Sequence, residues 1–301
     1  MMCLMWIDDS AIGEPVLGTL LRAWSLPLVP LVSLSVTLVL YLRGWRAARV
    51  TRGRELPAWR AACFVAGLVM LWIALASPIE ALDDYLLAAH MIQHFILMSI
   101  APPLMVLGAP VVPILRGVPR VLIRGWLRPV FRAGWLRAIV RTVTHPVFAW
   151  IAMNVAYLGW HVPAAFELTF RSDWIHDGEH VCFLATSLAF WWVVLSPWPA
   201  RARWPRWAMI PYLLGADILN TVLSATLAFS GRVLYQSYAV APRICFLTPV
   251  KDQVAAGSEM WVLNSLVFLI PAVAIAAKEL SPRFLVAPST RGNIAGEVPQ
   301  G

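Results

Sequence analysis

Long apolar runs alternate along the chain with short charged stretches. Seven of these runs are each long enough to cross a bilayer as a helix, because about 20 residues at 1.5 Å per residue match a hydrocarbon core of about 30 Å. The runs lie at 24–42, 61–79, 85–106, 147–166, 180–197, 209–229 and 254–277. The pattern predicts an all-α fold, a polytopic membrane helical bundle with seven transmembrane helices.

Arginine is distributed unevenly over the segments between these runs. Most of the 24 basic residues fall between runs one and two, three and four, and five and six, or in the tail, while most acidic residues fall in the other segments. By the positive-inside rule, the N-terminus is outside and the C-terminus is cytoplasmic. We therefore expect an extracytoplasmic N-terminal segment at 1–23, a transmembrane domain at 24–279 and a disordered cytoplasmic tail at 280–301. Acidic residues near the start, Asp8, Asp9 and Glu14, argue against a cleavable signal peptide.

Composition agrees with a membrane protein: 60% of the 301 residues are hydrophobic and 13% are charged. The net charge of +8 follows the predicted topology, so we expect the lipid bilayer, and no nucleic acid, as a partner. Between runs three and four, arginine recurs about every four residues among apolar positions. This spacing predicts an amphipathic segment on an anionic membrane surface, with binding of a protein partner as the alternative. The four cysteines form no C-x-x-C pair.

Five of the six histidines fall at the predicted outer ends of the runs. His90 and His94 are four residues apart, so they share one helical face, and His176 and His180 repeat this spacing. Polar side chains at membrane depth usually face the bundle interior, and imidazole with nearby thioether sulfur suits copper, especially Cu(I). The plainer alternatives are hydrogen bonds for the histidines and filler packing for the methionines. The predicted metal ligands are His90, His94, His161, His176 and His180, with Met91, Met98, Met260 and Asp217 as possible auxiliary residues.

Other polar positions predict further contacts inside the bundle. Asn154, Asn220 and Asn264 are expected to meet there, and Asp217 is either buried with a hydrogen bond or an element that handles protons or cations. Pro102 and Pro103 should kink the third run and release backbone carbonyls below the histidines, with a kink that serves packing only as the alternative. No Glu follows the first His of either pair, and no nucleophile elbow, P-loop or dinucleotide fingerprint is present. The chain is therefore not expected to be an enzyme.

The string HMIQHFILMSIAPPLMVLGAPVVPILR, from His90 to Arg116, resembles the signature of the CtaG-like cytochrome c oxidase assembly factors of bacteria, the group named for caa-type oxidases. Further similar motifs follow in order: HP at 145–146, WHVPAAFE at 160–167, EH at 179–180 with FWW at 190–192, LYQSY at 234–238 and DQVAAGSEMW at 252–261. The resemblance covers about residues 60 to 275. The chain departs from the family pattern mainly at apolar positions, such as Phe95 and Ile96.

This resemblance implies a seven-span protein of the bacterial inner membrane that is needed to mature a haem–copper oxidase, at the step that supplies copper. It places His90, His94, His161 and His180 at family positions, while His176 falls in a more variable loop. An oxidase subunit or a copper chaperone is the implied partner. Two alternatives stay open: a haem-binding redox bundle, with axial ligands from two facing helices, and a metal-free assembly scaffold.

Overall fold

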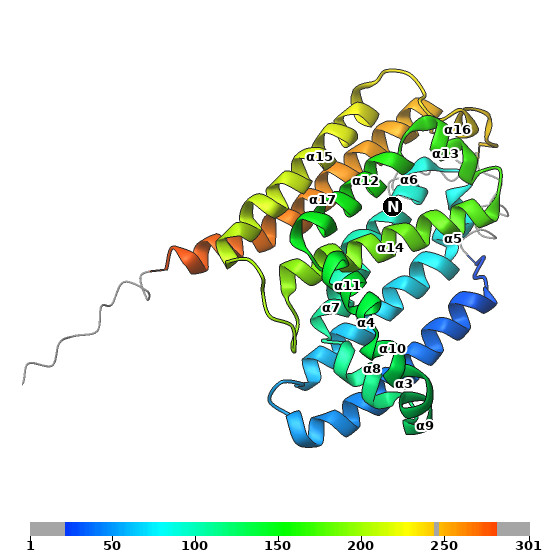
Figure 1. Cartoon of the computed structure of the whole chain (residues 1–301). Coiled ribbons are helices and arrows are strands. Elements are labelled where there is room, and N and C mark those ends of the chain that lie inside the picture. The colour runs from blue at the N-terminus through cyan, green and yellow to red at the C-terminus, as the bar shows by residue number, and fades with distance from the viewer. Residues whose placement is uncertain (1–21, 244–246, 282–301) are drawn as a thin grey trace, which may run out of the picture.

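The computed structural model describes residues 22–243 and 247–281, which form a bundle of long helices with no strand in these ranges (Figure 1). Among the described residues, six helices are long and apolar enough to cross a membrane, so the chain is a multi-pass membrane protein. They are Leu28–Arg52, Ala58–Asp83, Leu87–Leu107, Asp173–Leu195, Arg206–Phe229 and Pro249–Glu279. A shorter apolar helix, Pro146–Trp160, occupies the position of the predicted fourth span.

The first described helix, α3 (Leu28–Arg52), ends ten residues beyond the predicted run, which ended at 42. The prediction was wrong here because charge alone does not end a helix. No proline interrupts residues 43–52, and the backbone remains helical throughout. The side chains of Arg46, Arg49 and Arg52 are exposed on this part of the helix. Long basic side chains can keep their charged ends in water while the helix continues.

The third span consists of α6 (Leu87–Phe95), a π-helical turn η1 (Ile96–Ile100) and α7 (Ala101–Leu107). It follows α4 (Ala58–Ala76) and the short α5 (Pro78–Asp83). Pro102 has no N–H to donate to the carbonyl of Met98, and the indole Nε1 of Trp191 donates to that carbonyl instead, at 3.2 Å. The predicted release of a carbonyl below the histidines is confirmed, and a side chain from another helix satisfies it.

The predicted fourth and fifth spans had the wrong boundaries. The fourth run is interrupted, since α12 (Pro146–Trp160) ends before His161 and Pro163 begins a separate helix, α13 (Pro163–Thr169). The fifth begins seven residues early, at α14 (Asp173–Leu195); Ser172 at the N-cap position makes no side-chain cap hydrogen bond, and the acidic Asp173 in the first turn favours this helix start. His176 is therefore helical and lies one turn before His180, not in a loop.

The last two long helices, α15 (Met209–Phe229) and α17 (Pro249–Glu279), run side by side (Figure 1). The helix α17 starts five residues earlier than predicted, because Thr248 caps it by accepting a hydrogen bond from Lys251 N at 3.3 Å. Asn220 of α15 and Asn264 of α17 meet inside the bundle, as predicted, with a 3.2 Å hydrogen bond. Along the chain, η3 (Arg206–Ala208) comes directly before α15, and the short helix α16 (Gln236–Val240) comes after α15 and before α17.

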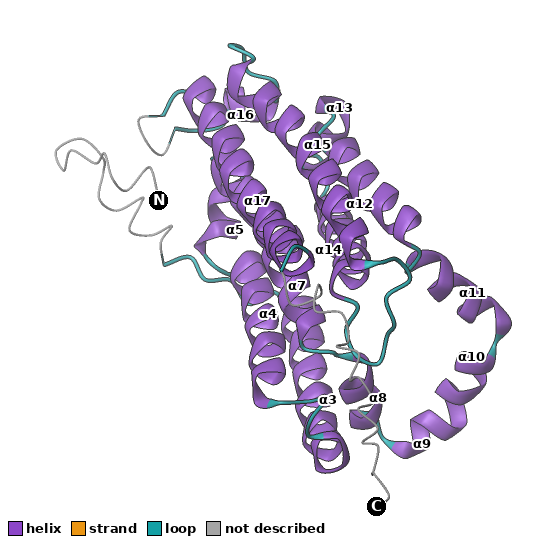
Figure 2. Cartoon of the chain, turned by 90° about the vertical axis from the view of Figure 1, so that its left-hand side faces the viewer, coloured by secondary structure: helices purple, strands orange, loops and turns teal. Residues whose placement is uncertain are grey.

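A series of short helices joins the third and fourth spans. It contains α8 (Val111–Gly117), α9 (Arg120–Leu122), η2 (Ile123–Leu127), α10 (Arg128–Arg132) and α11 (Gly134–Val143). Figure 2 shows α9, α10 and α11 as an arc beside the bundle. In α11, the exposed apolar residues Trp135, Ile139 and Val143 are spaced four apart, so they form one stripe. The segment is amphipathic, as predicted, and its contact with lipid stays a prediction.

Two earlier expectations fall mainly on residues that the structure does not describe. The N-terminal segment 1–23 lies outside the described residues except for residues 22 and 23, and the tail 280–301 lies outside them except for residues 280 and 281. Cys3 and Cys245 also lie outside the described residues. Cys63 and Cys182 are free.

Candidate metal centre

Five imidazole rings form one cluster near the end of the bundle where α5, α13 and α16 lie. The ring centroid of His90 lies 4.2 Å from that of His94 and 5.4 Å from that of His176. The His94 centroid lies 5.8 Å from that of His180 and 5.9 Å from that of His161. The structure thus brings together two histidines of α6, two of α14 and His161, which follows the last residue of α12. Their role as metal ligands stays a prediction.

The imidazole nitrogens of this cluster are unusually short of hydrogen-bond partners. Four of the five histidines are buried, with exposed fractions of 2–6%, and His176 is half-buried. The buried nitrogens without a partner are His90 Nε2, both ring nitrogens of His94, His161 Nε2, His176 Nε2 and His180 Nε2. Each unsatisfied buried polar group costs about 1–3 kcal/mol. Several such atoms facing one another are typical of a site built for a ligand.

Two carboxylates belong to the cluster, and the sequence analysis did not select either of them. Glu179 is completely buried, and neither of its oxygens has a hydrogen-bond partner. Its Oε1 lies 3.8 Å from His94 Nε2, and Asp83 Oδ2 lies 3.9 Å from His176 Nε2. Two groups therefore hold ligand atoms within 4.8 Å of one another: His90 with His94 and Glu179, and His90 with Asp83 and His176. The sequence signal for Glu179 was its spacing, since it lies three residues after His176 on one helical face.

The orientation of His161 is fixed by a backbone group. Its Nδ1 lies 2.7 Å from the carbonyl oxygen of Tyr157, one turn earlier in α12. A carbonyl can only accept, so Nδ1 carries the proton and the unpartnered Nε2 keeps a free lone pair. Metal-binding histidines commonly have this arrangement. The Tyr235 hydroxyl donates to the His161 carbonyl at 2.9 Å, and burial raises the pKa of Tyr235, which keeps this donor protonated.

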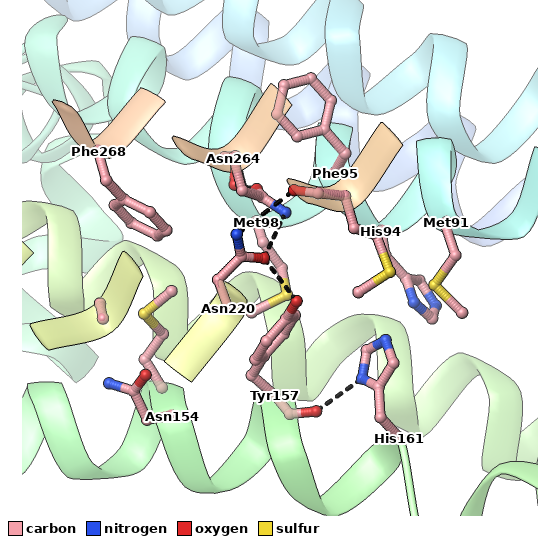
Figure 3. A pocket seen from close by; sticks show the side chains of 14 residues that line it. Met91, His94, Phe95, Met98, Asn154, Tyr157, His161, Asn220, Asn264 and Phe268 are labelled. Carbon is pink, nitrogen blue, oxygen red and sulfur yellow. Dashed lines mark hydrogen bonds between the residues drawn. The ribbon is translucent and has the colours of Figure 1, made fainter. Parts of the chain in front are cut away.

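A small cavity adjoins His94 and His161. Its volume is about 20 Å³, which is room for about one water-sized species. Figure 3 shows Met91 beside the two imidazoles at one end of this cavity, with Phe268 and Asn154 at the other end. Four thioether side chains line it, from Met91, Met98, Met153 and Met260. The three predicted auxiliary methionines thus line this cavity, and Met153, which was not among the predicted residues, lines it as well.

A hydrogen-bond network lines the middle of this cavity. The Asn220 Oδ1 atom accepts from the hydroxyl of Tyr157 at 2.8 Å and from the amide of Asn264 at 3.2 Å (Figure 3). Ser99 Oγ lies 2.5 Å from Asn264 Oδ1. These polar groups are satisfied by one another, so they hold α12, α15, α17 and η1 in place and are not free to bind a ligand.

The remaining predicted residues lie away from the imidazoles. Asp217 accepts a hydrogen bond from Ser265 Oγ at 2.7 Å, as one of its two predicted roles required, but it is half-buried rather than buried, and it does not line the cavity. His145 is exposed and precedes α12, at the other end of that helix from His161.

Contacts from distant segments hold α6 in place. Asp252 of α17 accepts from the backbone N–H of Leu87 at 2.7 Å and of Ala88 at 3.2 Å, so it caps the first turn of α6. The Gln93 amide donates to the carbonyl of Ala74 at 2.9 Å and to the Glu80 carboxylate. These bonds fix the rotation of α6 about its axis and so direct both of its histidines inward.

The fold and the cluster define a class: a multi-pass helical membrane protein with buried histidines and carboxylates gathered at one end of the bundle. The comparisons with known proteins then give the family. The chain belongs to the cytochrome c oxidase caa3 assembly factor family, whose model matches residues 39–280.

Relatives of this chain occur in mycobacteria. Uncharacterized proteins of Mycobacterium bovis and Mycobacterium tuberculosis are each 25% identical over 275 residues, covering 87% of this chain and 40% of the relative. An uncharacterized protein of Mycobacterium leprae is 24% identical over 247 residues, covering 79% of this chain and 36% of the relative. The chain thus spans about 40% or less of the length of these relatives. No solved structure matches it.

Proposed function

We propose that this chain is a non-catalytic membrane assembly factor that binds copper at the histidine cluster and assists its delivery to a haem–copper cytochrome c oxidase. One observation supports the metal part: one cluster holds six buried imidazole nitrogens without a hydrogen-bond partner, on five rings, together with the Glu179 carboxylate, which also has no partner. The oxidase part rests on family membership.

The side chains present fit copper. Neutral imidazoles and thioethers are favourable ligands for Cu(I), while magnesium and calcium prefer all-oxygen sites. His94 and His161 adjoin the four methionines of the cavity, and Glu179 would offset part of the ion's charge. Copper bound here would be cargo for the oxidase, held by His90, His94, His161, His176 and His180, and no bond-making step is assigned to the chain.

We further propose that α12 is the seventh span, with the N-terminus outside and the C-terminus in the cytoplasm of the bacterial inner membrane. Fifteen helical residues reach only about 22 Å, which a locally thinner bilayer would accommodate. The arginine-rich short helices that follow α7 support this orientation under the positive-inside rule. The cluster would then open to the outside, where an oxidase subunit or a copper chaperone could reach it.

The alternatives agree less well with the geometry. A haem group needs a pocket of several hundred Å³, and the cavity beside His94 and His161 has about 20 Å³. A metal-free scaffold would leave the orphaned imidazoles and Glu179 as uncompensated costs to folding.

Metal analysis of the purified full chain, loaded with Cu(I) under anaerobic conditions, tests the copper proposal. We expect copper to bind the wild-type chain and to be lost in the His90→Ala/His94→Ala variant. Equal copper in both proteins would reject copper binding at this cluster. In cells, the same variant should accumulate in the membrane while the oxidase lacks activity. A variant that disappears from the membrane altogether would instead favour the scaffold role.

A further inference from the structure

Two cavities lie next to each other at the arginine-rich end of the bundle, away from the histidine cluster. One has a volume of about 310 Å³ and the other about 300 Å³, and Arg203 and Val140 line both of them. They lie among α11, the start of α12, the end of α14 and the segment that leads into α15. Each is large enough for part of a lipid-sized molecule.

The polar lining of these cavities is strongly basic. Arg201, Arg203 and Arg206 line the larger cavity, and Arg137, Arg141 and Arg203 line the smaller one. Within residues 22–243 and 247–281, no carboxylate forms an ion pair with any of these arginines. Five guanidinium groups thus gather around adjoining cavities without a protein counter-charge, and an anion would relieve their mutual repulsion.

Arg203 is fixed in a position where it can serve both cavities. Its guanidinium donates to the carbonyl of Arg141 at 2.9 Å and to Thr144 Oγ1 at 3.2 Å. A guanidinium has five N–H donors, so several remain for a ligand, and its planar fork matches two oxygens of a phosphate.

Helix ends of both signs border the larger cavity. Pro146, the first residue of α12, and Leu195, the last residue of α14, both line it. The partial positive charge at the start of α12 favours an anion and the partial negative charge at the end of α14 opposes it, so the arginines supply the attraction. The other walls are apolar, with Trp192 and Ile275 lining the larger cavity and Phe131 and Leu136 the smaller one.

We propose that these two cavities form a binding site for the head group of an anionic glycerophospholipid, with its phosphate at Arg203 and its acyl chains along the apolar walls. The chemistry recognised is a phosphate ester, and the apolar walls indicate a lipid rather than free phosphate as its source. The proposal is independent of metal binding, since no residue of the histidine cluster lines either cavity.

Native mass spectrometry of the full chain in a non-ionic detergent tests this site. The added probes are phosphatidylglycerol, phosphatidylcholine and inorganic phosphate. We expect the wild-type chain to retain phosphatidylglycerol over phosphatidylcholine. The Arg203→Gln variant should weaken retention of phosphatidylglycerol at least tenfold. The control is Arg43→Gln, which removes an exposed arginine of α3 that lines neither cavity.

Several outcomes would overturn the proposal. Equal weakening by Arg203→Gln and Arg43→Gln would show attraction by net charge rather than a site. Equal retention of the two lipids would show no recognition of the anionic head group. Displacement of bound lipid by millimolar inorganic phosphate would identify a site for free anions. Arg203→Lys is the control for misfolding. Lysine keeps the positive charge but lacks the planar, two-pronged guanidinium. This variant should therefore keep the thermal unfolding midpoint of the wild type and lose part of its lipid binding.

Discussion

His94 Nε2 and Glu179 Oε1 lie 3.8 Å apart in the interior of the bundle, and neither atom has a hydrogen-bond partner. The gap is too long for a hydrogen bond, and it allows one ion to contact both atoms. Glu179→Gln keeps the shape of the side chain and removes its charge. We expect a fall in copper affinity of at least about tenfold, measured by competition with a Cu(I) chelator.

The same variant should not unfold the chain. A buried carboxylate without a partner is costly, so replacing it with a neutral amide should leave the thermal unfolding midpoint of the metal-free protein unchanged or raise it. Glu167→Gln is the matched control, because the Glu167 carboxylate accepts hydrogen bonds from Ser237 and lies outside both ligand groups. Unchanged copper affinity in Glu179→Gln would remove Glu179 from the site.

The loss of copper binding caused by each single histidine substitution should increase with the burial of the imidazole ring that is removed. His94 is buried with both nitrogens unpartnered, so His94→Ala should abolish copper binding. His176 is half-buried at the edge, so His176→Ala should weaken binding and leave measurable occupancy. His145→Ala, at the opposite end of α12, should bind like wild type. Metal content per chain measures all three, and equal loss in His145→Ala would show that the effect is general.

The sequence could predict the histidine face because helical spacing alone places His90 above His94, and His176 above His180. Spacing places Glu179 on the same helical face as His176, but it does not show that the carboxylate reaches His94, since that depends on how α14 packs against the third span, a segment distant in the chain. Ser172 and Asp173 are residue types typical of a helix start, but the apolar run begins only at residue 180, so the apolar pattern alone predicts too late a start for α14. The end of α3 was also not predictable from charge, because arginine is a good helix former and its exposed side chain does not interrupt the backbone hydrogen bonds.

Trp191 and Pro102 should show energetic coupling. Trp191→Phe removes the donor to the carbonyl of Met98, so we expect a loss of about 1–3 kcal/mol in the free energy of unfolding. Pro102→Ala restores a backbone N–H that can reach the same carbonyl. Trp191→Phe should therefore cost less in the Pro102→Ala background than alone. Unfolding in detergent with all four proteins of this cycle measures the coupling, and additive losses would contradict it.

Gly44 permits a close contact between α3 and α8. A Cβ atom there would overlap the backbone carbonyl of Pro113 in α8 and lie 2.5 Å from Gly117 N. Backbone atoms cannot rotate away as a side chain can, so Gly44→Ala must push α3 and α8 apart, at a cost of about 1–3 kcal/mol or more. Gly159→Ala is the control: its Cβ would meet nothing within 4 Å, and alanine favours the helix by about 1 kcal/mol. Thermal unfolding in detergent should show a lower midpoint for Gly44→Ala and an equal or higher one for Gly159→Ala. An unchanged midpoint in Gly44→Ala would mean that the contact between α3 and α8 yields without loss of stability.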